Sequence, residues 1–235
     1  MNCAILQPSY LPWRGYFDQI RRVDVFVFYD DVQYDHHGWR NRNRIKTANG
    51  VRWLTVPVRQ AGHRTELRSI AETEIHWDAK PWTRSHFDSL RSAYRDAPFW
   101  SRYEPLLEAV YSRHDRYLAD LTIETTTLIA RELGFPTRLL RSSSLPSRGT
   151  KTERLLSILS HLGATHYLTG PAARNYLDEE MLQNAGVDVE YMTYDYPPYE
   201  QLHPPYEPHV SIVDLLLMTG PDARHHFGQV AAAPG

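Results

Sequence analysis

The first thirty residues constrain the fold most strongly, because strand and helix patterns alternate there over a very short distance. Residues 2–7 form an apolar run, residues 15–22 carry a helical pattern, and residues 24–29 form a second apolar run. Strands connected through a helix pair in parallel and take a right-handed crossover. The sequence therefore predicts a βαβ unit, and ligands of open parallel sheets bind outside the carboxyl ends of the strands.

The remaining chain predicts a larger α/β fold with two additions. Asn49-Gly50 lies between strand-like segments and indicates a β-hairpin. Helical patterns fill residues 80–134, which we predict to be a helical insertion or cap over the sheet. Strand and helix patterns then alternate again. We predict a single domain over residues 1–235, built on a Rossmann-like, mostly parallel sheet, with a frayed tail at 228–235.

Composition narrows the class of protein. The formal net charge of −2 gives no electrostatic reason to expect nucleic acid or an anionic membrane surface as a partner. The longest apolar run is much shorter than the roughly 20 residues of a membrane span, and the first residues lack a signal-peptide pattern. Cys3 is the only cysteine, so no disulfide or cysteine metal cluster forms within the chain. We expect a cytoplasmic protein without a metal or a cofactor.

The segment from residue 7 to residue 58 concentrates indoles, amides and guanidinium groups. A packed core has little use for so many polar groups beside tryptophans, whereas a ligand pocket combines apolar walls with a few placed donors and acceptors. We therefore predict a substrate site here. The candidate substrate-binding residues of this segment are Gln7, Tyr10, Trp13, Tyr16, Gln33, His37, Trp39, Asn41, Arg42, Asn43 and Trp53.

Three residues are candidates for catalysis. Asp30 and Asp31 follow the second strand and could act as a general base or anchor an amine; the alternative is that they are turn or cap acids. Because adjacent strand residues point to opposite faces, we expect at most one of them in the site. His86 shares a helix face with apolar residues, which is typical of a histidine satisfied within the core.

Two further candidates lie near the start of a predicted helix at residue 151. The serine run 142–144 and Lys151 could bind a phosphate or carboxylate there, because helix N-termini favour anions; plain capping is the alternative. Ser143 and Lys151 are the residues we assign to this site. Cys3 lies about 13 Å along the first strand from the predicted site, which favours a small buried residue over a nucleophile.

Six motifs resemble the WbqC-like family, whose members are encoded in bacterial surface-polysaccharide and natural-product gene clusters. The motifs are QPSYLPWRGYF (7–17), DDVQY (30–34), W-x-NRN (39–43), WLTVPV (53–58), YLTG (167–170) and SIVDLLLMTG (211–220). The resemblance implies a biosynthetic enzyme that transfers or condenses a small acyl or aminoacyl group. It also matches His86, with Trp82, to a W-x-x-x-H arrangement of the family, which favours a catalytic role.

A second likeness is to nucleotidyltransferases with an H-x-G-H motif, and it implies a nucleotidyltransferase-like sheet. The equivalent residues here run from Trp13 to Tyr16, so Gly15 is retained and aromatic residues replace both histidines. Those histidines contact nucleotide phosphates in that family, so their replacement argues against ordinary nucleotidyl transfer.

These observations lead to two functional hypotheses. The first is an enzyme of natural-product or glycan biosynthesis that forms an amide, imine or related bond from a carrier-bound or activated amino acid or acyl donor. In it Asp30 or Asp31 handles an amine proton and Arg42 holds an anionic group. The second is a non-catalytic module that binds a nucleotide sugar or a carrier protein; thioester hydrolysis is a variant of the first. The candidate partners are a small-molecule substrate, an acyl or peptidyl carrier protein, and a second copy of the chain.

Overall fold

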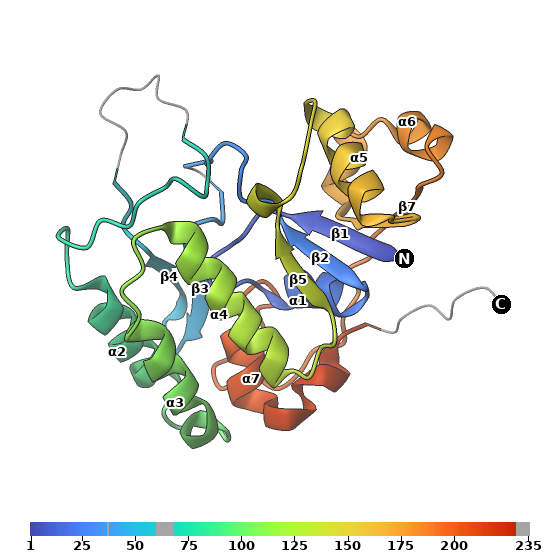
Figure 1. Cartoon of the computed structure of the whole chain (residues 1–235). Coiled ribbons are helices and arrows are strands. Elements are labelled where there is room, and N and C mark those ends of the chain that lie inside the picture. The colour runs from blue at the N-terminus through green and yellow to red at the C-terminus, as the bar shows by residue number, and fades with distance from the viewer. Residues whose placement is uncertain (37, 60–67, 229–235) are drawn as a thin grey trace.

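A five-stranded parallel sheet forms the centre of the protein (Figure 1). The computed structural model describes residues 1–36, 38–59 and 68–228. In spatial order the strands are β5 (Arg138–Arg141), β2 (Val25–Phe28), β1 (Asn2–Leu6), β6 (His166–Thr169) and β7 (Asp188–Tyr191). The predicted α/β, Rossmann-like fold is thus confirmed.

The predicted βαβ unit is present at the start of the chain. Strand β1 pairs with β2 in parallel, with Ile5 opposite Val27, and α1 (Arg14–Arg21) makes the connection. Apart from Asn2, both strands consist of apolar residues, because each strand is covered on both faces, as parallel sheets require.

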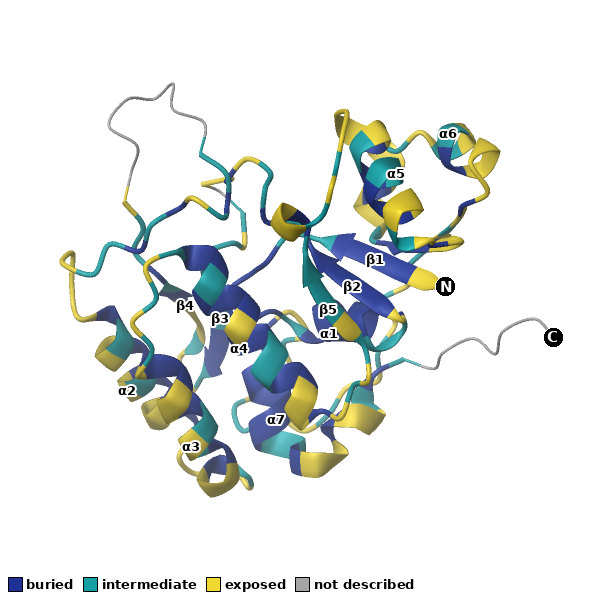
Figure 2. Cartoon of the chain, in the orientation of Figure 1, coloured by how far each residue is buried: buried dark blue, intermediate teal, exposed yellow. Residues whose placement is uncertain are grey.

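Two cores cover the two faces of the sheet, and β1 and β2 between them are largely buried (Figure 2). Cys3, Ile5 and Val27 face the smaller core, which is completed by α5 (Lys151–Leu162) and α6 (Glu179–Asn184). Ala4 and Phe26 face the larger core, which includes α1 and α7 (Ile212–Thr219). Alternation along each strand therefore assigns neighbouring residues to different layers. Burial also raises the pKa of the Cys3 thiol to about 12.

The connection from β2 to β5 carries both additions to the sheet. It contains the hairpin of β3 (Arg42–Thr47) and β4 (Gly50–Thr55). The helices α2 (Trp82–Tyr94), α3 (Trp100–Tyr111) and α4 (Leu118–Glu132) follow. In Figure 1 these helices lie beside the hairpin, on the side of the molecule remote from α5 and α6. Their inward faces belong to the larger core, so this region packs continuously with one face of the sheet.

A buried polar cluster fastens the hairpin to the helices. Tyr94 of α2 accepts a hydrogen bond from the Lys46 backbone N–H (2.9 Å) and donates to the Asp214 carboxylate of α7 (2.8 Å). Tyr199 donates to the same carboxylate at 2.6 Å. Burial raises the pKa of Asp214. Asp214 stands at the third position of its helix and would suit a capping box, yet Ser211 caps that helix alone, accepting from the Val213 N–H at 3.3 Å.

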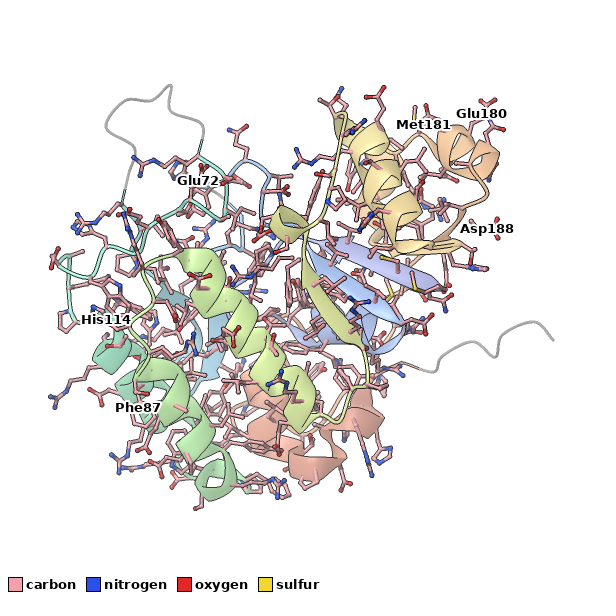
Figure 3. All side chains as sticks on the ribbon, viewed as in Figure 1. Glu72, Phe87, His114, Glu180, Met181 and Asp188 are labelled. Atoms are coloured by element: carbon pink, nitrogen blue, oxygen red, sulfur yellow. The ribbon has the colours of Figure 1, made fainter. Side chains whose placement is uncertain are left out.

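Figure 3 labels side chains at two opposite ends of the molecule. Glu180 and Asp188 point outward from α6 and β7, whereas Phe87 and His114 lie at the opposite end, with α2 and α3. Within the ranges that the structure describes, no helix combines the length and apolar character needed to cross a membrane. The predicted frayed tail lies outside the described residues, apart from Gly228.

Candidate functional site

A cavity of about 390 Å³ opens where the strand order of the sheet reverses. From β1 the chain proceeds to β2 on one side, and it later returns to place β6 on the other side. Leu6 ends β1, and Pro171 and Ala172 follow β6; all three residues line the cavity. This is the position at which open α/β sheets bind ligands.

The cavity walls are largely aromatic. The Trp13 indole lies edge-on to Tyr194, with ring centroids 4.9 Å apart, and Trp39 and Tyr16 contribute further rings. Burial raises the pKa of Tyr16, whose hydroxyl donates to the Gln7 carbonyl at 3.2 Å. Beyond the residues already named, the lining contains Ser9, Pro12, Arg40, Asn43 and His209. Apolar walls with few polar groups are typical of a small-molecule site.

Arg40 is the cation of this cavity. Its Nη1 donates to the carbonyl oxygens of Gln7 (3.0 Å) and Pro8 (3.4 Å). No partner for its buried Nε lies among the described residues. Burial lowers the pKa of the guanidinium, which nevertheless stays charged at neutral pH because its ordinary pKa is above 12. Arg40 is therefore placed to attract an anionic group.

The loop between β1 and α1 forms one wall and is held in an unusual conformation. Leu11 has a φ of +42°, a region that costs a residue with a side chain about 1–3 kcal/mol. The Asn43 amide donates to the carbonyl oxygens of Leu11 (2.6 Å) and Tyr10 (3.2 Å), and its oxygen accepts from the Arg44 N–H. Asn43 thus braces the loop while lining the cavity.

The residues at the H-x-G-H position pack against the protein itself. A Cβ on Gly15 would lie 2.3 Å from the Trp13 ring, so the glycine makes room for that indole. The absence of a side chain on Gly15 is thus used by the Trp13 ring. Arg14 is buried and donates to the Pro197 carbonyl (3.0 Å) and the Tyr206 hydroxyl (3.1 Å), which anchors the loop before α7.

That loop places a histidine at the cavity and a carboxylate beside that histidine. His209 lines the cavity beside Trp13 (ring centroids 5.6 Å), and its Nδ1 faces the Glu207 carboxylate at 3.5 Å. Arg44 donates to the His209 carbonyl at 2.9 Å and lies 3.9 Å from Glu207. A histidine oriented by a carboxylate through Nδ1 keeps Nε2 available for proton transfer.

Asp30 and Asp31 lie apart from this lining, at the carboxyl ends of β2 and β5. Asp30 is fully buried and accepts from the Ser143 N–H (3.0 Å) and hydroxyl (2.9 Å). Asp31 contacts Arg154. The Ser142 hydroxyl lies within hydrogen-bonding distance of both carboxylates. The expected separation of the two acids to opposite faces does not hold, because β2 ends at Phe28 and strand alternation ends with it.

His86 lies in the larger core with Tyr10. The Tyr10 hydroxyl is 2.9 Å from His86 Nδ1 and 2.7 Å from the Tyr111 hydroxyl, and all three residues are buried. Burial, with the positive charges of Lys80 and Arg52, lowers the pKa of His86 to about 4. The imidazole is therefore neutral at physiological pH, and it is absent from the cavity lining.

The remaining candidates divide between bracing positions and the surface. Asn41 is buried and donates to the Val56 carbonyl at 2.8 Å. Lys151 is exposed at the start of α5, where Thr150 and Glu153 form a capping box that satisfies the helix end. Arg42 and Trp53 lie on the outer face of the hairpin, and Gln33 is exposed in the preceding loop. His37 falls outside the described residues.

Comparison with known proteins identifies the family of the chain. The WbqC-like protein family matches residues 7–226. The chain belongs to the WbqC-like family. An uncharacterized protein of Mycobacterium tuberculosis, Rv1507c, is 40% identical over 226 residues, which cover 95% of this chain and 96% of that protein. No solved structure matches this WbqC-like chain significantly.

Sequence reasoning placed four lining residues of the WbqC-like protein in the site and missed others. Trp13, Tyr16, Trp39 and Asn43 line the cavity. Arg40 was passed over in favour of Arg42; it precedes β3, which begins at Arg42, so no strand pattern indicates where its side chain points. Tyr194 and His209 come more than 150 residues after Asn43 in the sequence. A histidine next to proline in a loop carries no distinctive local pattern.

Proposed function

We propose that this WbqC-like protein binds an anionic acyl or aminoacyl donor in the cavity between β1 and β6 and transfers the acyl group to an amine. The observation that carries the proposal is the cavity itself, at the switch point of the sheet, whose lining combines aromatic walls with the Arg40 guanidinium and with His209. Outside the lining, the Glu207 carboxylate faces His209 Nδ1 at 3.5 Å. The family's occurrence in biosynthetic gene clusters, which the sequence motifs imply, supports the class of reaction.

The cavity residues have separate tasks in this reaction. Arg40 binds the anionic end of the donor, and the Trp13 and Tyr194 rings pack against its apolar part and exclude water. The amine nitrogen attacks the acyl carbon and forms the new C–N bond. His209 accepts the proton that the amine loses, with its Nδ1 held toward Glu207. The bond from the acyl carbon to the leaving thiol or phosphate breaks, and the leaving group departs with the electron pair of that bond.

A turnover assay tests the proposal. The protein is incubated with acyl and aminoacyl pantetheine thioesters and an amine panel, while thiol release is followed by absorbance and amide formation by mass spectrometry. The His209→Gln variant should lower kcat by about 10²-fold or more, the usual contribution of a general base, and leave donor binding intact. His166→Gln is the matched control, because His166 also faces a carboxylate (Asp188, 3.6 Å) but at the amino end of β6.

Arg40→Gln tests the donor site separately. The variant should raise KM for anionic donors more than for neutral ones, since only the anionic group interacts with the guanidinium. Arg102→Gln, an exposed arginine of α3 that pairs with Glu132, is the control. If neither His209→Gln nor Arg40→Gln changes turnover, the cavity has no part in the mechanism.

A second function is favoured by one observation: among the residues that the structure describes, no Asp, Glu, Lys or Cys side chain lines the cavity. A non-catalytic module that binds a nucleotide sugar needs aromatic walls and a cation but no general acid. Thermal-shift stabilisation by nucleotide sugars, together with no product from any thioester and amine, would select this function over acyl transfer.

A further inference from the structure

The outer face of the β3–β4 hairpin exposes two tryptophans beside the cavity. Trp39 and Trp53 are 42% and 45% exposed, although a tryptophan usually buries most of its surface. Their rings lie 5.2 Å apart with an angle of 31° between the planes. Val51, also 42% exposed, points to the same face of β4 as Trp53. This apolar patch is continuous with the cavity, because Trp39 belongs to both.

Two guanidinium groups accompany the indoles. Arg44 is directly opposite Trp53 in the hairpin, and its Cζ lies 5.5 Å from the Trp39 ring and 5.7 Å from the Trp53 ring. The Arg42 Cζ lies 4.9 Å from the Trp53 ring. We call Trp39, Trp53, Arg42 and Arg44 the hairpin platform. Glu207 is the acid that faces Arg44, at 3.9 Å.

The chemistry of the hairpin platform matches one class of ligand. Flat aromatic bases stack on indole rings, and guanidinium groups bind phosphate oxygens. A polymer of nucleotides is not favoured, since the whole chain carries a net charge of −2 and the platform only two arginines. A single nucleoside phosphate satisfies both the rings and the charges.

We propose that the hairpin platform binds a nucleoside phosphate and that this moiety is the activating handle of the donor. The proposal rests on the proposed function, because the acyl group would then enter the adjoining cavity past Trp39. The base stacks on Trp53 and Trp39, and Arg42 and Arg44 bind the phosphate groups. Donors of this kind include an acyl adenylate and a coenzyme A thioester, which share an adenosine phosphate.

Binding of ADP, measured by titration calorimetry without any acyl substrate, tests the platform. Trp53→Ala should weaken ADP binding about 5- to 150-fold, the range given by about 1–3 kcal/mol per stacked base. Trp53 is absent from the cavity lining, so its loss reports on the platform. Arg42→Gln should also weaken ADP binding. Arg52→Gln is the matched control, because Arg52 pairs with Ile45 and points to the other face of the hairpin.

Further probes distinguish the ligand and its source. Adenosine 3′,5′-bisphosphate binding more tightly than ADP identifies a coenzyme A handle, and the reverse order identifies an adenylate; either result supports the proposal. Pyrophosphate binding as tightly as ADP, or ADP affinity unchanged in Trp53→Ala and Arg42→Gln, overturns it. If Trp53→Ala fails to fold, quenching of tryptophan fluorescence by ADP in the wild type and its loss in Arg42→Gln decide instead.

The two proposals fail separately. If the protein binds ADP but forms no amide, the hairpin-platform proposal stands and the acyl-transfer proposal is wrong. If the protein forms an amide from a pantetheine thioester but does not bind ADP, the acyl-transfer proposal stands and the hairpin-platform proposal is wrong.

Discussion

Acidification should destabilise the protein through His86, and the magnitude follows from its burial. Burial lowers the pKa of His86 to about 4, whereas an unfolded histidine titrates near pH 6.5. Between these values the unfolded state binds the proton and the folded state does not, so stability falls as the pH falls. The contribution is fully present above about pH 6.5 and is lost progressively toward pH 4.

The size of the effect can be stated for a defined interval. With about 1.36 kcal/mol per pKa unit, the displacement of His86 to about 4 gives a total loss of about 3 kcal/mol. Between pH 7 and pH 5 the loss is about 2 kcal/mol. This difference is a large fraction of the roughly 5–15 kcal/mol that stabilises a domain.

Urea unfolding at pH 7 and pH 5, performed on the wild type and on His86→Gln, measures the contribution of His86 to the free energy of unfolding. The variant lacks the titrating group, so other residues contribute equally to both proteins and the difference in pH dependence belongs to His86. We expect the wild type to lose about 2 kcal/mol more than the variant over this interval. Equal pH dependence, or a His86 NMR titration near pH 6.5, would refute a buried neutral imidazole.

Three substitutions test the packing around the site and the helices. Gly15→Ala places a methyl group against the Trp13 ring; it should cost about 1–3 kcal/mol and change the tryptophan emission, and an unchanged melting temperature would contradict the contact. Tyr94→Phe leaves the buried Asp214 carboxylate without one donor; a loss of about 1–3 kcal/mol in urea unfolding is expected, and a loss of under 0.5 kcal/mol would show that the bond is replaced. Thr150→Ala removes the capping box of α5 and should cost about 0.5–2 kcal/mol; an unchanged urea midpoint would show that the cap contributes nothing.

The fold was predictable where an element is indicated by a pattern of a few neighbouring residues. The βαβ unit and the hairpin followed from short apolar runs and from Asn49-Gly50, and the helix predicted to begin at residue 151 begins there. These elements depend on periodicity and turn chemistry over a few residues, which a single sequence contains.

Only the part of the candidate site that comes from residues 7–58 was predictable from the sequence. Trp13 and Asn43 lie within the segment whose composition indicated a pocket, whereas His209 comes from a loop brought to the cavity by Arg14 and Arg44. Asp30 illustrates the same limit, since its partner Ser143 lies 113 residues away. Contacts of this kind depend on tertiary topology, which local patterns do not specify.

The central position of β1 has a consequence for synthesis of the chain. One edge of β1 is paired as soon as β2 follows, but Asn2 must wait for His166 to complete the other edge. At about 5–20 residues per second, the ribosome needs roughly ten to thirty seconds to make the intervening chain. During that time an apolar strand has an open edge, which is a template for pairing with other chains. Nascent chains that stop before β6 should therefore aggregate or bind chaperones, and slower translation should lower the yield of folded protein.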